Sequence, residues 1–68
     1  MPENAIDANF PYEVLTTDGY FECDCKVRIV EHTSTKVVFI VPFGIDEVNV
    51  RVKDGNNNVV VHSYKVIV

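Results

Sequence analysis

The last third of the sequence, residues 45–68, constrains the fold most strongly, because two runs of strand-forming residues flank a cluster of turn residues. In the first run valines alternate strictly with polar residues, which predicts a strand with one buried face and one face in water. Residues 54–58, Asp-Gly-Asn-Asn-Asn, favour a reversal of the chain. Residues 59–68 are apolar on both faces over part of their length, as is typical of a covered strand. The stretch therefore predicts a β-hairpin.

Three earlier segments, residues 12–16, 20–32 and 36–42, also have the two-residue period of strands. Residues 20–32 exceed the usual strand length, so we expect this segment to bend or carry a bulge and to serve two sheets. Residues 36–42 are apolar on both faces, which predicts the central strand. Gly19 is expected to adopt a positive φ in the turn after the first segment.

The predicted architecture is a single all-β domain over residues 12–68. Five strands with short turns indicate either a small five-stranded antiparallel sandwich or a partly open barrel. Residues 1–11 show neither a strand nor a helix period and contain two prolines, so we expect them to form a flexible N-terminal arm. A chain of 68 residues has a small core, since it buries only about 60% of the surface that it exposes when unfolded.

Charge and composition narrow the class of partner. Ten acidic and six basic residues give a formal charge of −4, which argues against a partner held through phosphates, such as nucleic acid. No run of apolar residues is long enough for a membrane helix, and the N-terminus lacks the regions of a signal peptide. Cys23 and Cys25 are expected to be reduced thiols. These features favour a cytoplasmic location and leave a virion or extracellular one open.

The C-terminal half resembles bacterial and phage immunoglobulin-like domains, including hyalin-type repeats. In those families a Pro/Gly corner ends one strand, an alternating valine strand follows, and an Asp/Gly/Asn turn leads into the last strand. The matching positions are Pro42 and Gly44, then Val48, Val50 and Val52, then Asp54, Gly55 and Asn56, and then Tyr64, Val66 and Val68. The resemblance implies an immunoglobulin-like sandwich that acts as a binding or display module. A full domain of that type has about seven strands.

Cations on the polar faces of two predicted strands are the candidate binding residues. They are Lys26, Arg28, Arg51 and Lys53, with Tyr20 as the exposed aromatic residue beside them. Adjacent faces would form a basic patch, whereas the alternative is cross-strand pairing with acidic neighbours. The sixth candidate, Lys65, begins the apolar segment 65–68, which would pair with another chain if it lay at a sheet edge.

Metal and catalytic sites were weighed against plainer interpretations. Cys23 and Cys25, with His32 and His62, are zinc-ligand types, but the two cysteines continue an apolar row and are expected to be small buried side chains. Residues 54–58 begin like a calcium loop, yet lack its later glycine and acid. His62 and Ser63 are strand neighbours that point to opposite faces, so they cannot form a catalytic pair. No metal or cofactor is predicted.

The function predicted from these features is a non-enzymatic binding or structural module. It would contact a protein partner, or a second copy of itself, through a strand edge. One alternative is a small barrel of the OB or SH3-like type that binds nucleic acid or a peptide. Another is a small phage or bacterial inhibitor of a host protein.

Overall fold

The computed structural model describes residues 5–67, and in this range the chain forms strands and turns without a helix. No described helix is therefore available to cross a membrane. The all-β prediction is confirmed, but the count of five strands was wrong, because the described residues form seven. The strands are β1 (Ala5–Asp7), β2 (Pro11–Leu15), β3 (Phe21–Cys23), β4 (Arg28–His32), β5 (Lys36–Ile40), β6 (Glu47–Lys53) and β7 (Val59–Ile67).

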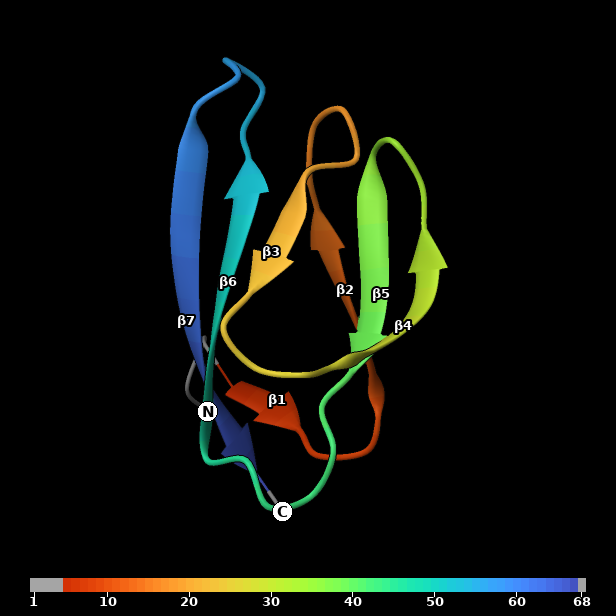
Figure 1. The fold of residues 1–68 in the computed structure, drawn as a ribbon, viewed down its shortest axis with the longest axis vertical. Helices are drawn as coiled ribbons and strands as arrows, with labels where there is room; N and C mark the ends of the chain where they lie inside the picture. Colours follow the sequence, from red (N-terminus) through yellow and green to blue (C-terminus); the bar gives the residue numbers. More distant parts are fainter. Residues whose placement is uncertain (1–4, 68) are drawn as a thin grey trace.

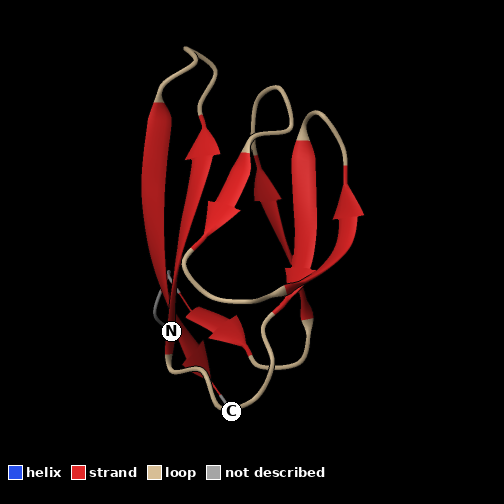
Figure 2. Cartoon of the chain, viewed as in Figure 1, coloured by secondary structure: helices blue, strands red, loops and turns tan. Residues whose placement is uncertain are grey.

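The strands form two sheets that face each other (Figures 1 and 2). The four-stranded sheet has the order β1-β7-β6-β3, and the three-stranded sheet has the order β2-β5-β4. Every pairing is antiparallel except that of β1 with β7, which is parallel. Within residues 5–67 no strand pairing joins the two sheets. The chain is therefore a β-sandwich, and the barrel alternative was wrong.

The core lies between the sheets and follows from the alternation of side chains along each strand. Val48, Val50 and Val52 of β6 point inward and are buried. From β5, Val37 and Phe39 do the same in the opposite sheet, where β5 is the central strand as predicted. Because side chains alternate along β6, its polar residues lie on the outer face of the sheet.

Residues 20–32 do not form one bent strand. They divide into β3 and β4, which belong to opposite sheets and are joined by residues 24–27. The carboxylate of Asp24 accepts hydrogen bonds from the backbone N–H of Asn49 at 3.0 Å and from its Nδ2 at 2.8 Å. These bonds end the β3–β6 ladder and release the chain toward the other sheet. The expectation that the segment serves two sheets is met by a break instead of a bend.

The predicted N-terminal arm is corrected for residues 5–11. Ile6 is 1% exposed and belongs to the core, and β1 pairs in parallel with the end of β7. The N–H of Ala8 donates to the carbonyl of Ile67 at 2.7 Å, and Pro11 begins β2. Burial of one isoleucine fixes this segment on the sandwich. Residues 1–4 and Val68 lie outside the described residues.

The two turns expected from the sequence are present. Gly19 has the predicted positive φ, 66°, and Asp18 before it has a φ of 57°. In the β6–β7 turn the carboxylate of Asp54 accepts the backbone N–H groups of Asn56 and Asn58 at 2.9 and 3.0 Å. A side chain that replaces missing backbone partners in this way holds the reversal in place.

Candidate binding surfaces

The predicted cationic residues separate into two groups and an isolated lysine. Arg51 and Lys53 lie on the outer face of the four-stranded sheet, beside Tyr20 and Glu22. Arg51 Nη2 is 3.6 Å from a carboxylate oxygen of Glu22, and Lys53 Nζ is 5.3 Å from the centroid of the Tyr20 ring. The Tyr20 hydroxyl donates to Glu22, and this bond raises the pKa of Tyr20. The Arg51–Glu22 pair is of the kind that the cross-strand alternative predicts, whereas Lys53 lies over an aromatic ring.

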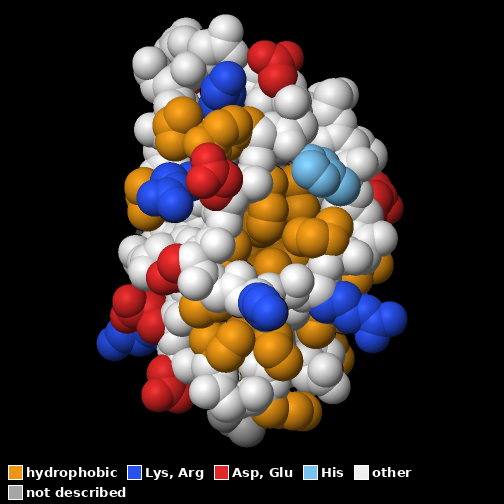
Figure 3. All heavy atoms as spheres, in the orientation of Figure 1, with side chains coloured by type: hydrophobic (Ala, Val, Ile, Leu, Met, Phe, Trp, Pro, Cys, Tyr) orange, Lys and Arg blue, Asp and Glu red, His pale blue; other side chains and the backbone are white. Residues whose placement is uncertain are grey.

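Lys26 and Arg28 lie elsewhere, on the connection between β3 and β4 and at the start of β4. They flank a hollow of about 360 Å³ whose apolar lining includes Val27, Ile40 and Pro42. Figure 3 shows apolar side chains gathered around this connection, with lysine and arginine side chains beside them. No carboxylate of the described residues forms an ion pair with either cation. The structure thus does not bring Lys26 and Arg28 together with Arg51 and Lys53.

Lys65 lies near the end of β7, with neighbours on both sides. Its partner in β6 is Glu47, and its partner in β1 is Ala5. The segment that the sequence suggested as an open edge is therefore covered by β1 at residues 65–67, and Val68 lies outside the described part of the chain.

The open edge lies farther up the same strand. β7 spans nine residues, and β1 pairs with three of them, which leaves residues 59–64. These residues have β6 on one side, and within residues 5–67 no strand lies on the other side. In Figure 1, β7 runs along the left margin, and β1 meets only its lower end. Val59 and Val61 are 48% and 60% exposed there.

Within residues 5–67 some backbone groups of this edge have no partner strand, and their direction is known. The N–H of Val66 donates to Asp46 on the β6 side at 2.8 Å, whereas the carbonyl of Ile67 accepts from Ala8 on the β1 side at 2.7 Å. Successive residues of a strand direct their backbone groups to opposite sides. The N–H and carbonyl groups of the odd-numbered residues in the open stretch therefore point away from β6. These residues are Val59, Val61 and Ser63.

The other edges of the two sheets have features that discourage pairing with another chain. β1 and β3 are three residues long. β4 has a bulge between Ile29 and Glu31. β2 begins with Pro11, which has no N–H to donate, and it carries the charged Glu13. The open stretch of β7 has no Pro, no Gly and no Asp, Glu, Lys or Arg. It is the unguarded edge of the described sandwich.

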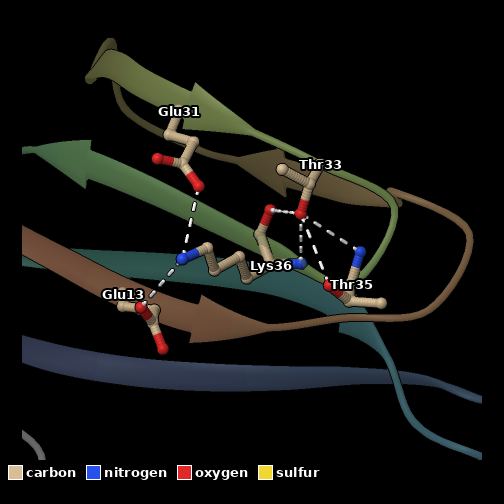
Figure 4. Close-up of polar contacts among 5 residues, drawn as sticks. All are labelled: Glu13, Glu31, Thr33, Thr35 and Lys36. Atoms are coloured by element: carbon tan, nitrogen blue, oxygen red, sulfur yellow. Dashed lines mark hydrogen bonds and ion pairs between the residues drawn. The ribbon is translucent and has the colours of Figure 1, made fainter.

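An ion-pair bridge crosses the outer face of the three-stranded sheet (Figure 4). Lys36 of β5 lies between Glu31 of β4, at 3.3 Å, and Glu13 of β2, at 3.7 Å. Glu31 and then Glu13 raise the pKa of Lys36. The hydroxyl of Thr33 accepts the backbone N–H groups of Thr35 and Lys36 in the adjoining turn. The bridge was not predicted from the sequence, because it depends on the register of three strands.

The residues weighed as metal ligands or catalysts have other partners. Cys23 and Cys25 are half-buried against the core, and burial is the main cause that raises the pKa of each thiol. Nε2 of His32 lies 2.6 Å from the carbonyl oxygen of Gly19. Ser63 Oγ donates to the side-chain oxygen of Asn49 at 2.6 Å. Among the residues that the structure describes, no three His, Cys, Asp or Glu side chains gather as a metal site.

Comparison of the chain with protein-family models, with curated proteins and with solved structures found no match. We therefore infer function from the strands and their edges. The sequence did single out β7 as an apolar strand able to pair with another chain. It placed the open stretch at the wrong end, because nothing in residues 1–11 revealed the three-residue strand that covers residues 65–67.

Proposed function

We propose that this chain is a non-enzymatic module that binds protein by strand addition along residues 59–64 of β7. The observation that carries the proposal is the contrast between this edge and the others: it is long and has no Asp, Glu, Lys or Arg, whereas the other edges are short, bulged or charged. Soluble proteins guard exposed edges because unpaired backbone groups recruit other strands. An edge left without such features is suited to recruiting one.

The strand order supports an immunoglobulin-like form of the sandwich. In that fold, strands lettered A to G in chain order place C, F and G in one sheet and B, E and D in the other. With β1 to β7 lettered in the same way, the sheets here have the orders C-F-G and B-E-D. The first strand differs, since it joins G in parallel instead of B. Seven strands in this order extend the resemblance seen in the C-terminal half to most of the chain.

The chemistry of such binding would divide between backbone and side chains. The free N–H and carbonyl groups of Val61 and Ser63 would supply affinity through a ladder of hydrogen bonds, independent of the partner's sequence. The side chains of Val59 and Val61 would favour a partner with apolar residues at alternate positions. The expected ligand is therefore an extended, uncharged segment rich in β-branched residues.

The proposal assigns no catalytic role to the polar residues of this strand. His62 and Ser63 are neighbours on opposite faces, and the Ser63 hydroxyl is engaged by Asn49 of β6. An inhibitor of a host protein would be one biological form of the same activity, since it also requires a protein-binding edge.

A titration with a strand-forming peptide tests the proposal. We expect the synthetic peptide of residues 59–65 to shift the amide resonances of β7 in the isotopically labelled chain and to slow hydrogen exchange at Val61 and Ser63. The matched control is the same peptide with Val61→Pro, which lacks the N–H of residue 61 and should bind less tightly. Equal effects of both peptides, or shifts confined to the Lys26 and Arg28 hollow, would contradict binding at this edge.

A further inference from the structure

We infer that the strand received by the open edge of β7 is β7 of a second copy, paired antiparallel about a twofold axis at Val61. This inference rests on the proposed function and specifies its partner. The observations that lead to it are the direction of the free backbone groups, the limits of the open stretch, and its charge.

The direction of the backbone groups restricts the register. In an antiparallel pair, residues that exchange both hydrogen bonds lie opposite each other, and they alternate with residues that exchange none. Because the odd-numbered residues face the edge, the favourable register sets Val61 opposite Val61 of the copy, and Val59 opposite Ser63 of the copy. Three such pairs form about six hydrogen bonds. A register centred on His62 forms fewer, because Val59 would then lie opposite Lys65, whose outer edge is already paired with Ala5 of β1.

The two ends of the open stretch limit how far a second copy can pair. Above Val59 the chain turns away toward β6, and from Lys65 onward the edge is taken by β1. A copy can therefore pair along residues 59–63, whose centre is Val61. The hydrogen-bond pattern requires odd-numbered residues to lie opposite each other, and the two limits leave Val59, Val61 and Ser63 for this pairing, so together they place the centre at Val61.

Charge and side chains also favour a second copy. The chain carries a formal charge of −4, so most of its surface repels an identical molecule. Residues 59–64 carry no carboxylate, lysine or arginine, so copies that meet there bring no like charges face to face. In the inferred register the exposed Val61 side chains lie side by side on the outer face. The twofold arrangement uses each edge once and closes as a dimer.

Sedimentation equilibrium of the full chain tests the inference over about 1 µM to about 1 mM, the range in which small interfaces dissociate. We expect a reversible monomer–dimer equilibrium. Val61→Lys should raise the dimer dissociation constant at least about tenfold, because two ammonium groups would then face each other across the axis. Val59→Lys should also raise the dissociation constant, and this variant replaces Val61→Lys in the test if Val61→Lys folds poorly. Val30→Lys is the control, since Val30 is 54% exposed on the bulged strand β4, and it should leave the constant unchanged.

Several outcomes would overturn the inference. A wild-type chain that is monomeric throughout the series does so, as does a Val61→Lys dimer as stable as the Val30→Lys dimer. Hydrogen exchange separates these failures from failure of the proposed function. If the monomer still binds the peptide of residues 59–65, the second copy is overturned and strand addition stands. If the Val61 and Ser63 amides are protected in the monomer without ligand, the chain covers its own edge and both proposals fail.

Discussion

Tyr64 shows how one residue on β7 joins the binding strand to the core. It occupies an inward position between exposed neighbours, and its ring meets that of Tyr12 edge to face at a centroid distance of 5.2 Å. Burial raises the pKa of Tyr64 to about 12, and Tyr12 adds to the effect. The phenol is thus held in its neutral form, and the orientation of β7 depends on a side chain that resists ionisation.

The stability of the fold should therefore fall at alkaline pH. Between pH 10 and 12 an unfolded tyrosine ionises while Tyr64 in the folded chain stays neutral, so the unfolded state is favoured as the pH rises. The stabilising difference is fully present below pH 10 and is lost toward pH 12. Near pH 11 the loss should reach up to about 1 kcal/mol. Urea unfolding of the wild type and of Tyr64→Phe near pH 8 and near pH 11 measures it.

In that experiment the phenylalanine variant should lose less stability than the wild type between the two pH values. Other groups that titrate in this range are common to both proteins, so the difference between the proteins reports on Tyr64. Equal losses would show that the residue does not carry the alkaline sensitivity.

At the scale of strands and turns, the β6–β7 hairpin depends on its turn. Asp54 accepts two backbone N–H groups with its carboxylate, and its own N–H donates to the carbonyl of Asn58 at 2.9 Å. The hydroxyl of Thr17, from the β2–β3 turn, donates to the carbonyl of Asp54 at 2.9 Å. This hydrogen bond joins the β2–β3 turn to the β6–β7 turn, and the β6–β7 turn sets where β7 begins.

Replacement of Asp54 by alanine should lower the free energy of unfolding by about 1 to 2 kcal/mol, because two backbone donors lose a charged acceptor. Asn56→Ala is the matched control, since the Asn56 side chain makes no hydrogen bond within the described residues and only its backbone N–H is used. Thermal unfolding of the three proteins compares them. A change in Asn56→Ala as large as that in Asp54→Ala would assign the effect to turn composition instead of the carboxylate.

Elements with local signals were predictable from the sequence, whereas those that depend on distant contacts were not. The alternating valines of β6 and the turn after them define the hairpin within one stretch of sequence. β1 was missed because three residues carry no period and their pairing partner lies at the other end of the chain. The break between β3 and β4 was missed because the alternation runs on through it, and the Asp24–Asn49 bonds that end β3 are long-range.

The candidate site was predictable only in part for the same reason. The lack of Asp, Glu, Lys and Arg in residues 59–64 is visible in the sequence, but the open stretch is defined by the pairing of β1 with residues 65–67. The grouping of the cations likewise followed from register, which paired Glu22 with Arg51 and left Lys26 and Arg28 in the other group.

For the molecule as a whole, the small core leaves a narrow margin of stability. A chain of 68 residues is expected to be stable by roughly 3 to 10 kcal/mol, from the usual range per residue. Phe39 is fully buried at the centre of the three-stranded sheet, and the rings of Tyr12 and Phe21 lie at centroid distances of 5.9 and 5.4 Å. This aromatic cluster links both sheets, so its removal affects the entire sandwich.

Phe39→Ala should cost about 3 to 5 kcal/mol, which is enough to unfold much of the population at the lower end of that margin. Phe43→Ala is the control, because Phe43 is 62% exposed and its truncation should change little. Circular dichroism against urea concentration measures both. A Phe39→Ala chain with the midpoint of the wild type would contradict a single core shared by the two sheets.

The parallel pairing of β1 with β7 has a mechanical consequence. The first described strand lies beside the last, with Ala5 opposite Lys65 and Asp7 opposite Ile67. Tension that pulls the start of β1 and the end of β7 in opposite directions acts along both strands. It therefore loads their hydrogen bonds in shear, all at once, instead of opening them one after another. A chain under load through these two ends would meet its resistance first at this short pair, with the open edge of β7 still free.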